Sequence, residues 1–135
     1  MTDRISIPEF CTANRITITS KRTSSNPHML DSANMDHWKV TLHRARKQMT
    51  LVFSMGYCHG GSSPEVADVL NCLASDSASV ANSRGFEDWA SELGYDTDSR
   101  KAERTYQHCE AQATKLELFL GSALYNQLIW NTEAL

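Results

Sequence analysis

The spacing of hydrophobic residues changes near the middle of the chain. In the first half, three short segments are β-branched or alternate hydrophobic and polar residues with a period of two: 16–20, 37–43 and 49–55. This period is typical of half-buried strands. We therefore predict a three-stranded antiparallel meander over residues 16–55, with a loop at 21–36. The segment 49–55 is the most continuously apolar, which predicts that it is the central strand.

The second half has the spacing of amphipathic helices. One helix is predicted to begin at Ser63-Pro64-Glu65, because serine caps helices and proline is tolerated in the first turn. The segment 75–84 is rich in serine, alanine and asparagine, which predicts a loose turn or a frayed helix. Two hydrophobic stripes recur every three or four residues: Val66, Val69, Leu70 and Leu73, then Ala102, Tyr106, Cys109, Ala113, Leu116 and Leu120.

Capping residues set the other predicted helix boundaries. Ser6, followed by Pro8 and Glu9, predicts a short N-terminal helix over about 7–14. A short helix from Phe86 is expected to stop at Gly94, and a long helix is expected to begin at Thr97 or Asp98 and to end at Gly121. A last helix is predicted over 122–130.

Together these elements predict an α+β fold. We expect a small antiparallel sheet of about three strands packed against C-terminal helices, with a short N-terminal helix. At 135 residues the chain has the length of a single domain, 1–135, with a β-rich part at 16–55 and a helical part at 64–130.

Composition agrees with a globular protein, with 41% hydrophobic and 21% charged residues. No apolar run approaches the roughly 18 residues that a membrane helix needs, so no membrane partner is expected. The first ten residues, MTDRISIPEF, do not have the pattern of a secretory signal. The four cysteines form no CxxC pair, so we expect them to be thiols in a reducing compartment.

Charge is unevenly distributed along the chain. Residues 1–60 carry a net charge of +4, whereas residues 61–135 carry −7. The basic half contains a candidate contact set for nucleic-acid phosphates, flanked by Lys21-Arg22, in and before a predicted hairpin turn: Lys39, Arg44, Arg46 and Lys47. The alternative interpretation is a solvated hairpin tip.

The acidic half contains a denser cluster: Glu87, Asp88, Glu92, Asp96 and Asp98. These carboxylates are candidates for binding a partner by lying where the phosphates of a nucleic acid would lie. The alternative interpretation is a solvated helix surface. Asp96-Thr97-Asp98 also resembles the start of a calcium loop, but the positions that should supply a third donor, a glycine and a glutamate hold Arg100, Lys101 and Gln107.

The other candidate chemistry is weaker. The run from Gly56 to Pro64, GYCHGGSSP, has neither the lysine of a phosphate-binding P-loop nor the GxGxxG spacing. Residues Cys11, Cys58-His59, Cys72 and His108-Cys109 lack the paired spacing of structural zinc sites. We therefore predict no catalytic residue, no cofactor and no metal, and we do not expect an enzyme.

The run from Phe86 to Tyr106, FEDWASELGYDTDSRKAERTY, resembles a segment of small, mostly uncharacterised proteins of tailed bacteriophages and prophages. Its pattern is similar to F-[ED]-[DE]-[WF]-x-x-[ED]-[FLY]-G-Y-D-x-D-S-R-x-A-x-x-x-Y, and those proteins also place a small β-rich region before it. The resemblance covers residues 85–121 well and 37–75 loosely.

This resemblance implies a phage or prophage accessory protein in the cytoplasm of a bacterial host. Phage proteins of this size are often inhibitors of host defence, anti-CRISPR proteins among them. We therefore expect a protein that binds and occludes a host defence protein or ribonucleoprotein complex, such as a CRISPR effector. The alternative expectation is a small nucleic-acid-binding accessory protein that uses Lys39, Arg44, Arg46 and Lys47.

Overall fold

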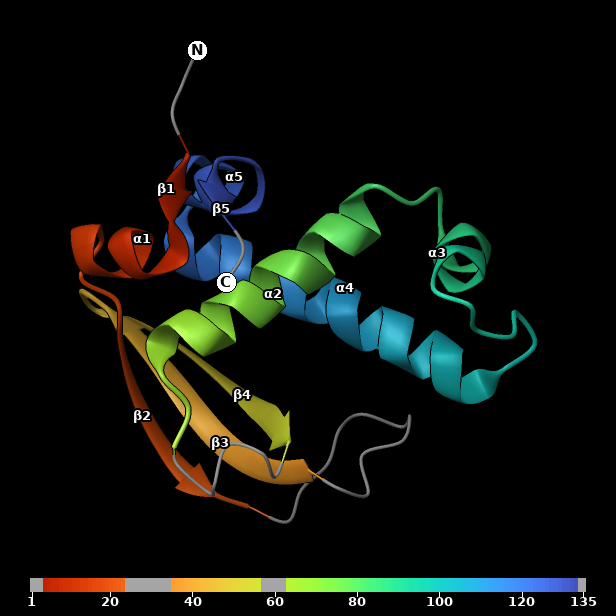
Figure 1. The fold of residues 1–135 in the computed structure, drawn as a ribbon, viewed down its shortest axis with the longest axis horizontal. Coiled ribbons are helices and arrows are strands. Elements are labelled where there is room, and N and C mark those ends of the chain that lie inside the picture. Colours follow the sequence, from red (N-terminus) through yellow and green to blue (C-terminus); the bar gives the residue numbers. More distant parts are fainter. Residues whose placement is uncertain (1–3, 24–34, 57–62, 134–135) are drawn as a thin grey trace.

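Helices cover one face of a small sheet in the computed structural model, which describes residues 4–23, 35–56 and 63–133. The predicted α+β fold is confirmed (Figure 1). Its elements are β1 (Ile5–Ser6), α1 (Ile7–Ala13), β2 (Thr17–Arg22), β3 (Met35–Arg44), β4 (Lys47–Gly56), α2 (Val66–Ala81), α3 (Phe86–Glu92), α4 (Arg100–Leu120), α5 (Ser122–Trp130) and β5 (Thr132–Glu133).

The sheet is the predicted antiparallel meander, in the order β2-β3-β4. Leu42 of β3 lies opposite Ile18 of β2 and Met49 of β4, so these three apolar residues share one face. β4 is therefore an edge strand within the described residues, and the prediction that 49–55 is central was wrong. Its apolar side chains are buried by the helices above the sheet, which does not require a strand on each side.

The main core lies between this sheet and the helices. Side chains that are at most 1% exposed come from α1, β3, α2, α4 and α5: Ile7, Phe10, Val40, Leu42, Val69, Leu70, Leu116 and Leu128. Each such side chain stabilises the fold by about 1.5–3 kcal/mol through removal of apolar surface from water. β1 and β5 add a short parallel pair, in which Ile5 lies opposite Thr132, that the sequence did not indicate.

Two of the predicted helix starts were wrong by one or two residues. α2 begins after Glu65 rather than Ser63, and Asp68 Oδ2 accepts a hydrogen bond from the Glu65 backbone N–H over 3.2 Å. α4 begins after Ser99, whose Oγ accepts from Ala102 N over 3.2 Å. Serine is available as the cap because Asp96 closes a turn immediately before it.

The segment 75–84, predicted as a loose turn or a frayed helix, is mostly regular helix. α2 continues to Ala81, and Ser77 on its inner face is only 3% exposed. Small side chains let α2 pack closely along α4 (Figure 1). Tertiary packing therefore overrides the modest helix preference of serine here.

α3 ends as predicted at Gly94, in a Schellman motif. The Tyr95 N–H donates to Ala90 O over 2.8 Å and the Gly94 N–H donates to Ser91 O over 3.3 Å. Gly94 has a φ of +77°, a left-handed conformation that glycine adopts without steric penalty.

α1 ends in the same motif without a glycine. The Ile16 N–H donates to Cys11 O over 3.0 Å, and the Arg15 N–H donates to Thr12 O over 3.2 Å. Arg15 has a φ of +54°, which crowds its Cβ against the following backbone. The backbone of the exposed Arg15 is therefore locally strained, although the hydrogen bonds of the helix end are favourable.

We predict that Arg15→Gly stabilises the protein by about 0.5–1 kcal/mol, because relief of the left-handed penalty exceeds the added entropy of the unfolded chain. Urea unfolding monitored by circular dichroism measures the change. Arg15→Ala is the matched control, since it removes the same side chain and retains the penalty. Equal stability of the two variants would show that φ is not the cause.

Candidate functional site

The five acidic candidates belong to α3 and to the turn before α4, at one end of the molecule (Figure 1). Two of them have structural roles: Asp88 Oδ2 accepts from Arg84 N over 3.0 Å, and Asp96 Oδ1 accepts from Asp98 N over 2.9 Å. The remaining side chains, Glu87, Glu92 and Asp98, are exposed and make no hydrogen bond or ion pair within the described part of the chain. We call these three residues the acidic set.

An aromatic cluster holds this end of the molecule on α4. The Trp89 ring lies 5.4 Å from Tyr95 and 5.3 Å from Tyr106, and Phe86 lies 5.8 Å from Tyr106, as measured between ring centroids. Trp89 is only 3% exposed. The acidic set therefore lies on a packed scaffold. Such a scaffold suits an interface whose backbone moves little when a partner binds.

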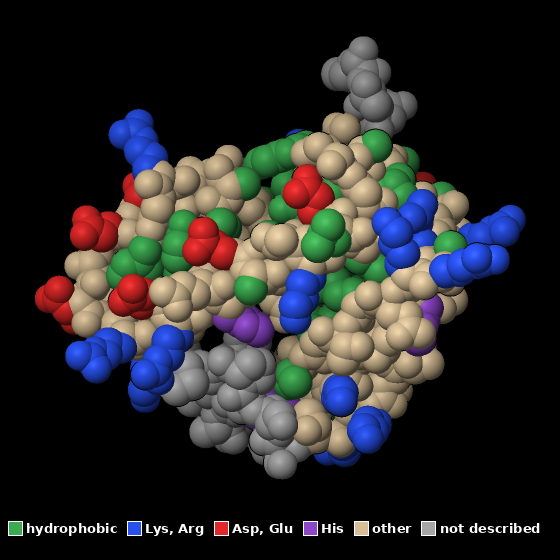
Figure 2. Space-filling model, turned by 180° about the vertical axis from the view of Figure 1, so that it is seen from behind, with side chains coloured by type: hydrophobic (Ala, Val, Ile, Leu, Met, Phe, Trp, Pro, Cys, Tyr) green, Lys and Arg blue, Asp and Glu red, His purple; other side chains and the backbone are tan. Residues whose placement is uncertain are grey.

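The surface around the acidic set is not uniformly acidic. Exposed Leu93 and Tyr95 lie between its members in sequence, and Arg84, Arg100 and Lys101 flank it. Figure 2 shows acidic side chains gathered at the α3 end with lysine and arginine side chains beside them. This mixture of apolar and charged groups is more typical of a protein–protein contact than of a uniform imitation of a phosphate backbone.

The four basic candidates do not form one surface. Lys47 Nζ donates to the Leu118 carbonyl near the end of α4 over 3.1 Å, which places a positive charge at the negative end of that helix. Arg44 is partly buried, and its Nε has no hydrogen-bond partner among the described residues. Arg46 is exposed in the hairpin turn, whereas Lys39 lies on the face of the sheet that points away from the helices.

That outer face of the sheet, which we call the open face, has no carboxylate among its described side chains. Lys39 lies directly opposite Lys21 on β2, a cross-strand pair of like charges that sequence analysis missed because it depends on the register. Its other outward side chains are Thr17, Thr19, His37, Thr41, His43, Gln48, Thr50, Val52 and Ser54. Three hydrogen bonds join them in pairs: Thr19 with His43 (3.0 Å), Thr41 with Thr50 (3.2 Å) and His37 with Ser54 (2.6 Å).

The cysteines and histidines considered for a zinc site lie partly outside the described residues, because Cys58 and His59 belong to 57–62. The phosphate-loop candidate at 56–64 falls largely in the same segment. Within the described ranges, no three His, Cys, Asp or Glu residues are placed to hold a metal ion. Burial raises the pKa of Cys11 to about 11 and, together with nearby Asp76, that of Cys109 to about 12, so both thiols stay protonated near neutral pH.

Comparisons with known proteins provide no relative for this chain: no family model, no curated protein and no solved structure matches it. The resemblance of 86–106 to phage proteins therefore remains an expectation. Among the described helices, none combines the length and the apolar character needed to cross a bilayer.

Asp76 on α2 is the described carboxylate whose environment most disfavours its charge. Burial raises its pKa from 3.8, and a weak hydrogen bond from Cys72 Sγ, 3.8 Å away, offsets part of the effect. Since the folded-state pKa is the higher one, the stability associated with protonated Asp76 is present at a pH below 3.8 and is lost as the pH rises through the folded-state value.

We predict that Asp76→Asn is more stable than the parent protein at neutral pH, and that the difference shrinks toward zero as the pH falls to 3.8. Thermal melts across this pH range measure the effect. Glu92→Gln, which neutralises an exposed carboxylate on α3, is the control and should show no such pH-dependent gain. A constant difference at every pH would show that the change acts through packing instead.

Proposed function

We propose that this protein acts as a binding protein, and that it inhibits a bacterial defence complex by occluding part of its surface. The observation that supports the proposal is the acidic set, whose three carboxylates have no partner among the described residues and neighbour exposed Leu93 and Tyr95 in sequence, next to a packed aromatic cluster. Apolar and aromatic contacts surrounded by charges are the usual composition of a protein interface.

The host context of this proposal comes from the resemblance of 86–106 to phage proteins. In that context the partner is a cytoplasmic host protein or ribonucleoprotein, and a CRISPR effector is the first to test. Carboxylates on a fixed scaffold suit the basic groove in which such an effector holds nucleic acid, because complementary charges speed association and select the partner.

We predict that the protein co-purifies with a CRISPR effector and abolishes its binding to target DNA. The combined variant Glu87→Gln, Glu92→Gln, Asp98→Asn should lose at least about tenfold in affinity, since it removes the charges and preserves the shape. The matched control is Glu9→Gln, Glu117→Gln, Glu133→Gln, which removes equal charge at exposed sites outside the acidic set. Effectors of several defence types that all bind DNA normally in its presence would refute the proposal.

The open face favours a second candidate function, binding of nucleic acid. Lys21 and Lys39 lie opposite each other, and no described carboxylate lies on the same face. The two positive charges therefore repel each other, and an anion bound between them would relieve the repulsion. A depression of about 240 Å³ lies beside the two lysines and is lined also by Thr19, Ser20 and Thr41. Thr19 and Thr41 point to this face, and their hydroxyls suit phosphate oxygens.

We predict that a fluorescent single-stranded oligonucleotide binds with an affinity that falls steeply from about 50 to 200 mM salt. Lys21→Gln with Lys39→Gln should lower the slope of log K against log salt by about 1.4, or 0.7 for each phosphate that is no longer neutralised. The variant should be at least as stable as the parent, because a repulsion is removed. Lys101→Gln with Arg104→Gln on α4 is the control, and flat titrations at low salt would dismiss this function.

A further inference from the structure

β4 has an unpaired edge. The His37 carbonyl accepts from Thr23 N over 3.0 Å, so His37 and the alternate residues of β3 direct their backbone groups toward β2. The intervening residues of β3 therefore bond to Met49, Leu51 and Phe53 of β4, which lie opposite them. What remains on the outer side of β4 are the N–H and C=O groups of Gln48, Thr50 and Val52, with which no other described strand pairs.

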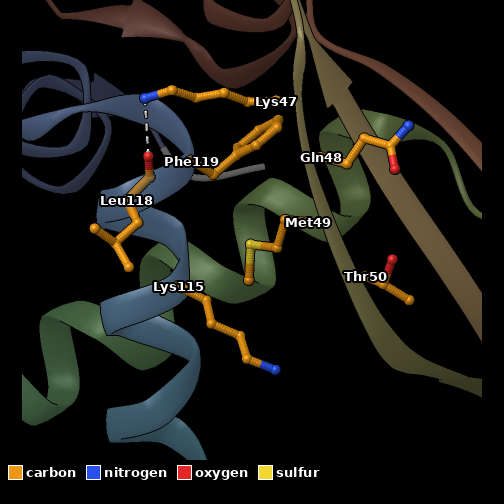
Figure 3. Close-up of a pocket in the computed structure, with 7 residues that line it drawn as sticks. All are labelled: Lys47, Gln48, Met49, Thr50, Lys115, Leu118 and Phe119. Carbon is orange, nitrogen blue, oxygen red and sulfur yellow. Dashed lines mark hydrogen bonds between the residues drawn. The ribbon is translucent and has the colours of Figure 1, made fainter.

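A groove of about 470 Å³ opens along this edge, between β4 and the last turns of α4 (Figure 3). Met49 and Phe119, 4% and 3% exposed, form its base. Leu118 stands on its α4 side and is 71% exposed, the largest exposed fraction among the exposed large hydrophobic side chains of the described residues. The groove therefore combines unpaired backbone groups, which give affinity in strand addition, with a hollow beside an uncovered apolar side chain that can receive alternate side chains of an added strand.

The charge of the groove is positive. Its charged lining residues are Lys47 and Lys115, and no described carboxylate lines it. Lys47 Nζ is held by the Leu118 carbonyl, so it balances the negative end of α4, whereas exposed Lys115 makes no contact of this kind within the described residues. Lys115 is therefore the cation that remains available to a ligand.

This charge argues against a second copy as the occupant. Edge-to-edge pairing of two β4 strands would bring Lys47 and Lys115 of both copies toward one another, and lysines at an edge are a known device against such pairing. A partner strand that carries carboxylates would instead be attracted to this edge. Its carboxylates neutralise Lys115 while its backbone groups pair with those of β4.

We propose that the edge of β4 accepts an extended segment of a partner protein as a fourth strand, and that this segment alternates an apolar and an acidic side chain on the side that faces α4. Lys115 and Leu118 are three residues apart on α4, so their Cβ atoms are separated by about 5–6 Å. Side chains two residues apart on a strand are separated by about 6.8 Å, which matches an acidic residue to Lys115 and an apolar residue to Leu118.

This binding edge is distinct from both the acidic set and the open face, so it extends the proposed function without depending on either surface. A partner could hold this edge while the acidic set or the open face contacts a different part of the same complex. Two engaged surfaces would raise the affinity well beyond that of each alone. Failure of the peptide experiment below would leave both functions of the preceding section standing.

The test uses the full chain and a fluorescent octapeptide, Thr-Val-Thr-Glu-Thr-Val-Thr-Glu, in a polarisation titration. We expect saturable binding, a loss of at least about tenfold with Lys115→Glu, and a smaller loss with Leu118→Ser. Lys101→Glu is the matched control, because Lys101 is an exposed lysine on the same helix about 20 Å away and its change should have no effect. Thermal melts confirm that each variant is folded.

Two altered peptides separate strand addition from charge attraction alone. The octapeptide methylated on alternate backbone nitrogens, in each of the two registers, should bind in one register only, because methylation removes the donors that face β4. The counterpart with lysine in place of glutamate should not bind. The proposal is overturned if the octapeptide does not bind at about 1 mM, if Lys115→Glu binds it equally well, or if sedimentation shows a dimer that Leu118→Ser dissociates and the octapeptide does not.

Discussion

The helices cover only one face of the three-stranded sheet, and the other features of the surface follow from this one-sided burial. The apolar residues Trp38, Val40 and Leu42 of β3 lie on the covered face and are buried, while Lys39 and Thr41 point outward. No second layer of described residues lies over the outward positions, which on β2 and β3 are occupied by threonine, histidine and lysine. The same small sheet ends at β4, whose outer backbone groups remain unpaired among the described strands.

α4 connects the two parts of the molecule that carry candidate surfaces. Its C-terminal half contributes Leu116, Phe119 and Leu120 to the main core, whereas Tyr106 in its N-terminal half packs in the aromatic cluster with Trp89. The acidic set therefore depends on a cluster that is separate from the main core and is joined to it through the helix. Changes in the sheet should leave the α3 end intact, because the residues between the two clusters form one continuous helix.

Local patterns in the sequence predicted most of the fold. The alternation of Trp38, Val40 and Leu42 and the stripe from Ala102 to Leu120 are signals that depend only on near neighbours, and both were confirmed. Local capping shifted two helix starts by one or two residues, and the larger errors arose where a distant contact decides. α2 continues through a serine-rich segment because α4 supports it, and β4 is an edge strand because the meander places β3 in the centre.

The candidate surfaces were predicted less completely for the same reason. The acidic residues are neighbours in sequence and stay together in the fold, although Asp88 and Asp96 serve as hydrogen-bond acceptors for the backbone. The basic residues are also neighbours in sequence, but strand alternation sends Lys39 to the open face and places Lys47 against α4. The lysine pair of the open face and the groove beside β4 both require residues from distant segments, so no local pattern indicates them.

Two choices of residue on these surfaces are unfavourable for the fold itself. Lys21 opposite Lys39 is repulsive, and Leu118 exposes most of its side chain to water. Neither is imposed by the backbone, because a threonine at 39 or a glutamine at 118 would fit the same positions. Arg15, strained at the end of α1, shows that such a choice also occurs away from them. Local conflict alone is therefore insufficient evidence for a binding site, and the stronger argument is its coincidence with an open sheet face or an unpaired strand edge.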